Sequence, residues 1–425
     1  MDRGDLQQLS KDELIELVPR LQRPDKNSRN SSVPPSHDRK AIRQGSKPGG
    51  AKPGHEGHFR KLCAHPDITE DHRPLRCDGC DGLLGPGASG EVIGEYDAIE
   101  LPKVKPIVTR HRRFCLRCPA CGVKTPARLP EAATGTPFGP DIHALAIYPK
   151  SFQSVSYLRL EQMLADVFGL SVSQGAPMNM FARAKPLFAA QKDQAVVVLR
   201  QATSVASDET GVRIEGLNGF HWVFSCKQAV VHETAFARGA IVVREMMAGH
   251  KPGVWLSDRY SAQQNHGWHH QTCLAHLARQ VAFGCEAGED HLPALLKIWF
   301  GRVFDLAGRI GDMAGAAIAA RRRALEKELD RLLKTATACP VAKALQAKLE
   351  RAKHQMLTFC RFPGEVEATN NASERHLRPA VIARKVTNGY RAKWSADNEA
   401  AMRTTVDTAR LKGASPYQTI RTTLG

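Results

Sequence analysis

The chain has 425 residues, of which 42% are hydrophobic, so it can hold more than one domain with a packed core. Its 60 Lys and Arg outnumber 43 Asp and Glu and leave a formal net charge of +17, which suits a polyanionic partner. Eleven cysteines in a chain this long do not indicate a disulfide scaffold. No apolar run reaches membrane-spanning length and no signal peptide precedes the acidic start, so we expect a soluble cytoplasmic protein.

The first 61 residues divide into a short helix and a basic linker. Residues 1–22 are predicted to form one helix, because Ser10–Glu13 has the capping-box pattern and leucines recur at roughly helical spacing. Residues 23–61 are rich in Ser, Pro and Gly, which predicts a disordered segment. Residues 20–61 carry eleven Lys and Arg against three acidic residues. They are not part of an amphipathic helix, so the expected partner is a phosphate backbone rather than a membrane.

Two CxxC pairs predict a zinc ribbon over residues 62–131. Cys77–Cys80 and Cys118–Cys121 are separated by 37 residues, and each pair has a glycine nearby that permits a tight turn. Four thiolates in this arrangement are typical of one structural, tetrahedral zinc ion. Cys115 also forms a CxxC with Cys118, so it is an alternative ligand. We favour Cys118 and Cys121, because Cys115 follows Phe114 in a strand-like segment.

Residues 140–200 are predicted to be helical. The amphipathic stretch Ser156–Phe168 stops at Gly169, and a second helix is expected from about Ser173 toward Ala190, limited by two prolines. Helix, glycine turn and helix is compatible with a DNA-reading helix-turn-helix, and equally with an ordinary helical hairpin.

Residues 201–425 are predicted to form an α/β catalytic domain. A strand closing at Asp208 begins a meander whose hairpin turn is expected at Asn218–Gly219, because this pair tolerates positive φ. A helix over roughly 232–250 and a strand at Gly253–Asp258 follow. Strand, hairpin, helix, strand is the order of the ribonuclease H fold, in which the first and fourth strands are adjacent and parallel.

Three acidic residues in this domain, Asp208, Asp258 and Glu374, form the candidate catalytic site. Aspartates on two adjacent parallel strands can converge, and two Mg²⁺ ions held there would clamp a phosphodiester about to be cleaved. Two ordinary roles compete with this interpretation. An aspartate at a strand end often forms a turn, and Asn371–Glu374 has the pattern of a capping box.

The connection between Asp258 and Glu374 is long and strongly helical, which predicts a helical insertion over residues 286–362. Before it, Cys273 and His276 lie one helical turn apart. Two residues alone support metal ligation weakly, so we expect them to pack near the active site.

Many short blocks follow one another along nearly the whole chain: Asn27–Ser36, Lys52–Gly57, the two CxxC pairs, Ser207–Gly211, Trp255–Tyr260, Cys273–Arg279, Thr369–Pro379 and Arg384–Lys385. In these blocks and their order, the chain resembles the insertion-sequence-66 family of bacterial transposases. The chain departs from the usual pattern at Asp258–Ser261, Ala278–Arg279 and Val386–Tyr390, which indicates a divergent subgroup.

This resemblance implies a transposase that cleaves and joins the ends of its own element on a ribonuclease H-like core. Asp208 and Asp258 would hold two Mg²⁺ ions, and Glu374 would complete the coordination of one. Four basic residues would hold double-stranded DNA beside them: Arg375, Arg378, Arg384 and Lys385. His376 is either a further contact or a surface histidine without a role.

The protein would act near the nucleoid as a homo-oligomer on DNA, with helper proteins left open. The alternatives are a non-catalytic DNA-binding protein on the same scaffold and a nuclease that cuts without joining.

Overall fold

The computed structural model describes residues 10–11, 25–31, 55–57, 60–102, 104–130, 136–287 and 290–425. Apart from Ser10 and Lys11, the helix expected over residues 1–22 lies outside the described residues, as does most of the expected linker. The chain divides into two compact units, one of residues 40–106 and one of residues 1–39 with 107–425. The division falls inside the segment expected to be a zinc ribbon.

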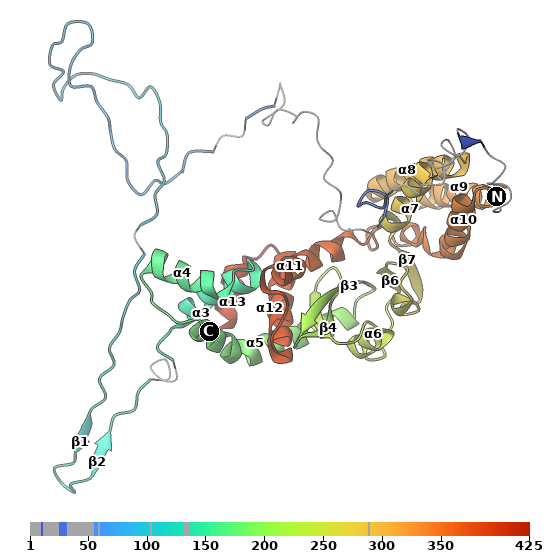
Figure 1. Ribbon diagram of the computed structural model, residues 1–425. Helices are drawn as coiled ribbons and strands as arrows, with labels where there is room; N and C mark the ends of the chain where they lie inside the picture. The colour runs from blue at the N-terminus through green and yellow to red at the C-terminus, as the bar shows by residue number, and fades with distance from the viewer. Residues whose placement is uncertain are drawn as a thin grey trace. The chain divides into compact units, whose positions relative to one another are not determined.

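A five-stranded sheet lies at the centre of the larger unit (Figure 1). Its strands are β3 (Ser204–Ile214), β4 (Leu217–Ser225), β5 (Val230–Ala235), β6 (Val254–Ser257) and β7 (His269–Thr272). The spatial order is β5-β4-β3-β6-β7; the first three strands are antiparallel, and β6 and β7 run parallel to β3. The predicted parallel pairing of the strand containing Asp208 with the strand before Asp258 is therefore confirmed.

The hairpin turn between β3 and β4 is not at Asn218–Gly219, so that prediction is wrong. The turn residues are Glu215 and Gly216, which have φ of 54° and 77°, while Asn218 and Gly219 belong to β4. Two consecutive residues with positive φ are what a tight hairpin requires. Gly219 has a packing role instead, since a Cβ there would lie 2.8 Å from Cδ1 of Ile214.

Two other strand predictions also need correction. Asp208 does not close its strand, because β3 continues to Ile214 and pairs with β4 throughout. The helix expected over 232–250 is shorter, since residues 230–235 form β5 and α6 spans only Ala240–Met247. In β5, Val231 packs into the sheet core while His232 faces the opposite side, an alternation that fixes these residues as a strand.

Helices cover both faces of the sheet. Trp222 and Phe224 of β4 pack on one face with α6 and the end of α5 (Gly175–Arg200). Val223, between them in sequence, points to the other face and packs against Leu377 of α11 (Asn371–Thr387). The long helix α12 (Lys393–Leu411) packs on β5 and α5. The arrangement is a mixed α/β layer structure.

The segment before the sheet is helical as predicted. It contains α3 (Pro140–Ile147), α4 (Tyr157–Phe168) and α5. In α4 the Ser156 side chain accepts a hydrogen bond from the Arg159 N–H, and Gly169 ends the helix with φ of 63°, as expected for a C-cap. The second helix extends ten residues beyond the predicted end, because burial of Ala195 and Leu199 in the sheet core stabilises it past Pro186.

The predicted helices between Asp258 and Glu374 are present and form a helical group beside β6 and β7 (Figure 1). The helices predicted in the insertion are α8 (His291–Arg309), α9 (Gly315–Leu333) and α10 (Pro340–Ala352), and α7 (Leu274–Ala287) precedes them. Their shared core includes the fully buried Trp299, whose Nε1–H donates to the Leu325 carbonyl at 3.0 Å.

The remaining strands and α-helices of the described residues are the short strands β1 (Cys115–Arg117) and β2 (Lys124–Pro126) and the C-terminal helix α13 (Pro416–Thr423). None of the helices in the described part of the chain is long and apolar enough to span a membrane.

Candidate active site

The three acidic residues come from three elements around the centre of the sheet. Asp208 lies within β3, Asp258 directly follows β6, and Glu374 lies in the first turn of α11. Asp208 pairs in register with Val223, whose side chain contacts Leu377 of α11, so Asp208 faces the side of the sheet that α11 covers. The fold thus turns all three residues toward the same region.

The electrostatics of Asp208 show that these carboxyl groups influence one another. Burial, first of all, together with the negative charges of Glu209, Asp258 and Glu374, raises the pKa of Asp208 to about 8, while the Glu209 N–H opposes the increase. That N–H donates to Oδ1 of Asp208 at 2.9 Å. Repulsion among carboxylates at a partly buried site is relieved by a bound cation, so the cluster is suited to divalent metal.

Glu209 is a fourth carboxylate that sequence analysis missed. It accepts hydrogen bonds from Gln263 Nε2 at 2.7 Å and from Arg238 Nε at 3.0 Å. Burial raises the pKa of Glu209, and the charge of Asp258 adds to the increase, while Gln263 and Arg238 oppose it. Consecutive residues of a strand point to opposite faces of the sheet. The sequence therefore gives no reason to expect the side chains of both Asp208 and Glu209 near one site.

Two of the acidic residues have an ordinary structural role as an alternative to catalysis: a turn for Asp258 and a helix cap for Glu374. The structure shows the first role but not the second. Asp258 does form a turn, since its Oδ1 accepts from the Tyr260 N–H at 2.8 Å. Glu374 does not cap its helix. The N-cap is Asn370, no side chain closes a capping bond there, and the Asn370 N–H donates to Sγ of Cys273 at 3.1 Å. The Glu374 carboxylate is therefore available for another role.

Three side chains from α7 and its N-terminus surround Glu374. Nε2 of His276 lies 3.9 Å, and a guanidinium nitrogen of Arg279 3.7 Å, from Oε1 of Glu374. Burial raises the pKa of the Cys273 thiol, although N–H groups of Asn370, His276 and Ala275 oppose the increase. Among the described residues, one group of three His, Cys, Asp or Glu has its ligand atoms all within 4.8 Å of one another: Cys273, His276 and Glu374.

The carboxylate oxygens of Asp208, Asp258 and Glu374 are spread more widely than the ligand atoms of this group. A pair of cations about 4 Å apart needs ligands spread more widely than a single ion does. The wider spacing of Asp208, Asp258 and Glu374 is therefore compatible with a two-ion site.

Helix α11 is fixed to the sheet at both ends. At its start, Nδ2 of Asn370 donates to the Ser207 carbonyl at 2.9 Å, and the hydroxyls of Ser373 and Ser225 lie 3.2 Å apart. Near its end, Arg384 donates to the Thr210 hydroxyl at 2.9 Å and to the Gly211 carbonyl. These contacts position Glu374 relative to Asp208.

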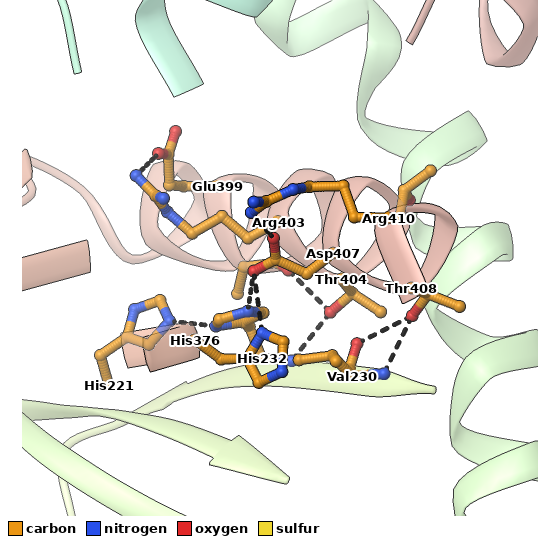
Figure 2. A network of polar contacts seen from close by, with 12 residues as sticks. His221, Val230, His232, His376, Glu399, Arg403, Thr404, Asp407, Thr408 and Arg410 are labelled. Carbon is orange, nitrogen blue, oxygen red and sulfur yellow. Dashed lines mark hydrogen bonds and ion pairs between the residues drawn. The ribbon is translucent and has the colours of Figure 1, made fainter. Parts of the chain in front are cut away.

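A buried polar network joins α11, α12 and the edge strand β5 (Figure 2). Asp407 of α12 accepts from Nε2 of His232 at 3.0 Å, and its carboxylate lies 3.9 Å from Nδ1 of His376. Burial would raise the pKa of Asp407, but the hydrogen bond from His232 and nearby positive charges hold it below its ordinary value. His376 thus contacts the interior, although sequence analysis considered only a DNA contact or a surface position.

The same network satisfies backbone N–H groups at the β5 edge of the sheet. The N–H groups of Val230 and His232 donate to the hydroxyls of Thr408 and Thr404, at 3.0 and 2.8 Å (Figure 2). Because β5 is an edge strand, these donors would otherwise lack a strand partner. Burial, with the charge of His232 adding to it, lowers the pKa of His221 well below its ordinary value; His221 and His232 share a 2.9 Å hydrogen bond.

The basic residues of α11 divide into two kinds. Arg375, Arg378 and Lys385 are exposed and recur at spacings that place them on one side of the helix. Arg384 is half-buried and bonded to β3 as described above, so part of its guanidinium group is used within the protein.

Each CxxC pair forms the same backbone turn. The Cys77 N–H donates to the Gly82 carbonyl and the Cys118 N–H to the Val123 carbonyl, both at 2.9 Å. N–H groups of Gly79 and Cys80 lower the pKa of Cys77, as those of Cys121 and Ala120 do for Cys118. Cys115 lies in β1 and not in such a turn.

The chain matches the family model described as the transposase IS66 family over residues 135–398. The match covers more than half of the chain and includes all three acidic residues, so this protein belongs to the IS66 family of transposases. Membership implies DNA binding. A comparison with curated proteins gives no match.

Proposed function

We propose that this chain is a DNA transposase that cleaves and joins phosphodiester bonds at the ends of its insertion sequence, with Asp208, Asp258 and Glu374 as the catalytic residues. One observation carries the proposal. The charges of Asp258 and Glu374 both contribute to the raised pKa of Asp208, although the three residues come from separate elements. The strand order and the parallel pairing of β3 with β6 support a ribonuclease H-like core.

The donor set fits Mg²⁺, which prefers oxygen ligands and is commonly held by one or two carboxylates. Asp208 and Asp258 would hold the two ions, and Glu374 would complete the coordination of one. When bound, two such ions activate the attacking hydroxyl and stabilise the leaving oxyanion, so no side-chain general base is required. Glu209 is held by Arg238 and Gln263, which leaves the other three carboxylates as the primary ligands.

The protein's own residues would position DNA beside the carboxylates. Arg375, Arg378 and Lys385 are exposed on the helix that carries Glu374, so they can contact the phosphate backbone. Arg384 would contribute with the part of its guanidinium group that β3 does not use. Such contacts fix the position of the duplex without reading its sequence. The protein would act as a homo-oligomer in the cytoplasm.

We also propose one structural zinc ion with Cys77, Cys80, Cys118 and Cys121 as ligands. The matching turns of the two pairs, with N–H groups directed at Sγ of Cys77 and Cys118, support these four cysteines. The position of Cys115 in a strand favours Cys121 over it.

The experiment that tests the function incubates purified full-length protein with Mg²⁺, labelled element ends and a target plasmid. A transposase gives both nicked ends and joined products. Nicks without joining would indicate a nuclease, and specific binding without either product would indicate a non-catalytic DNA-binding protein.

A further inference from the structure

Glu374 belongs to two neighbouring groups of possible metal ligands. The group that it forms with Cys273 and His276 differs from the acidic group in offering sulfur and nitrogen as well as oxygen. Cys273 precedes α7, His276 lies in its first turn, and Glu374 approaches from α11. One thiol sulfur, one imidazole nitrogen and one carboxylate oxygen are all within 4.8 Å of one another. Mg²⁺ has little affinity for sulfur, whereas this mixed set is typical of zinc.

The three ligand atoms must approach one another by at most about 1.5 Å to hold an ion, because all of them already lie within 4.8 Å of one another. Zinc bonds of about 2.0–2.3 Å in a tetrahedron place the nitrogen, oxygen and sulfur ligand atoms about 3.3–3.6 Å apart. Nε2 of His276 and Oε1 of Glu374 are already 3.9 Å apart, so they need to approach by about half an ångström. The side chains of His276 and Glu374 are 25% and 34% exposed, which leaves them room to move, whereas Cys273 is fully buried.

The polar atoms around this group are incompletely satisfied. Within the described part of the chain, Nδ1 of His276 is buried without a hydrogen-bond partner, as are Oε1 of Gln280 one turn along α7 and Oδ1 of Asn370. The 3.9 Å separation of Nε2 from Glu374 is also too long for a hydrogen bond. Nε2 of His276, the nitrogen that faces Glu374, is therefore free to bind an ion.

We propose that Cys273, His276 and Glu374 form a binding site for a thiophilic divalent cation of the zinc type, separate from the four-cysteine site. The three residues supply three ligands and leave the fourth position open to water. The two contacts of the Glu374 carboxylate, with His276 and Arg279, are longer than hydrogen bonds and can be displaced by an ion.

Occupancy of this site has a consequence that rests on the proposed function. Glu374 cannot serve the zinc-type ion and complete the Mg²⁺ site in the same geometry, so the two ions compete for one carboxylate. Zinc at this position would hold the transposase inactive until the ion is released.

Cadmium-113 NMR of the full-length protein tests the site without reference to activity. A site with one thiolate resonates well upfield of a four-thiolate site, so the two are resolved. We expect an upfield resonance in the wild-type protein that is lost in Cys273→Ser and in His276→Gln. It should remain in Cys285→Ser, a control in the same helix. Absence of the resonance in the wild type, or its persistence in His276→Gln, would overturn the proposal.

The competition is measured by adding Zn²⁺ to cleavage reactions in Mg²⁺, each variant serving as its own reference without zinc. The half-inhibitory zinc concentration should rise at least tenfold in Cys273→Ser relative to Cys285→Ser. Equal inhibition of both variants would overturn the competition for Glu374. If the protein has no cleavage activity at all, the proposed function is wrong. The cadmium resonance would still show whether the metal site exists.

Discussion

Replacing Asp208 by Asn should stabilise the metal-free protein, and the gain should grow with pH. The pKa of Asp208 is raised from 3.8 to about 8 in the folded protein. At about 1.36 kcal/mol per pKa unit, this shift sets an upper limit of about 5–6 kcal/mol on the cost of the charge. The side chain is only partly buried, so solvent screening reduces the expected gain to about 1–3 kcal/mol at pH 8.

The pH dependence follows from the sign of the shift. Because the folded-state pKa lies above the unfolded one, the favourable protonated form is fully present below pH 3.8. That contribution to stability is lost as the pH rises toward about 8. Asp208→Asn removes the titration, so its advantage over the wild type should be small near pH 4 and largest near pH 8. Added Mg²⁺ should stabilise the wild type more than the variant.

Unfolding can be followed by the fluorescence of Trp222 and Trp255, which are buried in the sheet core. Asp193→Asn on the exposed surface of α5 is the matched control and should change little. A metal-free Asp208→Asn protein that is no more stable than the wild type at pH 8 would refute the reasoning, because the carboxylate would then carry no electrostatic cost.

Three further predictions concern other parts of the chain. Asp407→Ala should lower the free energy of unfolding by about 3–5 kcal/mol, because it removes the anion of a buried charged network; chemical denaturation measures this, and a loss below 1 kcal/mol would contradict it. Cys121→Ser should lose one zinc ion per chain by metal analysis while Cys115→Ser keeps it, and the reverse result would show that Cys115 is the ligand. Deleting residues 23–61 should flatten the dependence of log affinity on log salt by several units, at about 0.9 per phosphate contact, and weaken binding to element ends and scrambled DNA alike. An unchanged slope, or a loss confined to the ends, would show that this segment does not neutralise phosphates.

The parts of the fold that could be predicted depend on local signals. Ser156 and Gly169 bound α4 because capping is decided within a few residues. The parallel pairing of β3 with β6 follows from strand order and from a crossover containing a helix. The hairpin turn was misplaced because Asn218–Gly219 has turn chemistry, whereas the tight packing of Ile214 on Gly219 is a tertiary contact.

The sequence suggests the acidic residues of the candidate site, but it does not reveal what surrounds them. The sequence placed Asp208, Asp258 and Glu374 in one domain, and the structure adds Glu209 to them through contacts with Arg238 and Gln263. Cys273 and Glu374 are far apart in sequence, so nothing local indicates that they are neighbours. The role of Asp407 was likewise hidden, because a single acidic residue on a helix gives no sign of which strand it will contact.

The central claim is tested most directly by the single-turnover rate of Mg²⁺-dependent cleavage at element ends in Glu374→Gln, compared with Glu367→Gln. Glu367 is exposed shortly before α11, so its variant controls for the loss of one negative charge. A metal ligand contributes several kcal/mol to transition-state stabilisation, which corresponds to a loss of about 100- to 1,000-fold. We expect that loss in Glu374→Gln, with DNA binding retained, a similar loss in Asp208→Asn and Asp258→Asn, and a wild-type rate in Glu367→Gln. A wild-type cleavage rate in Glu374→Gln would contradict the assignment of this carboxylate to the active site.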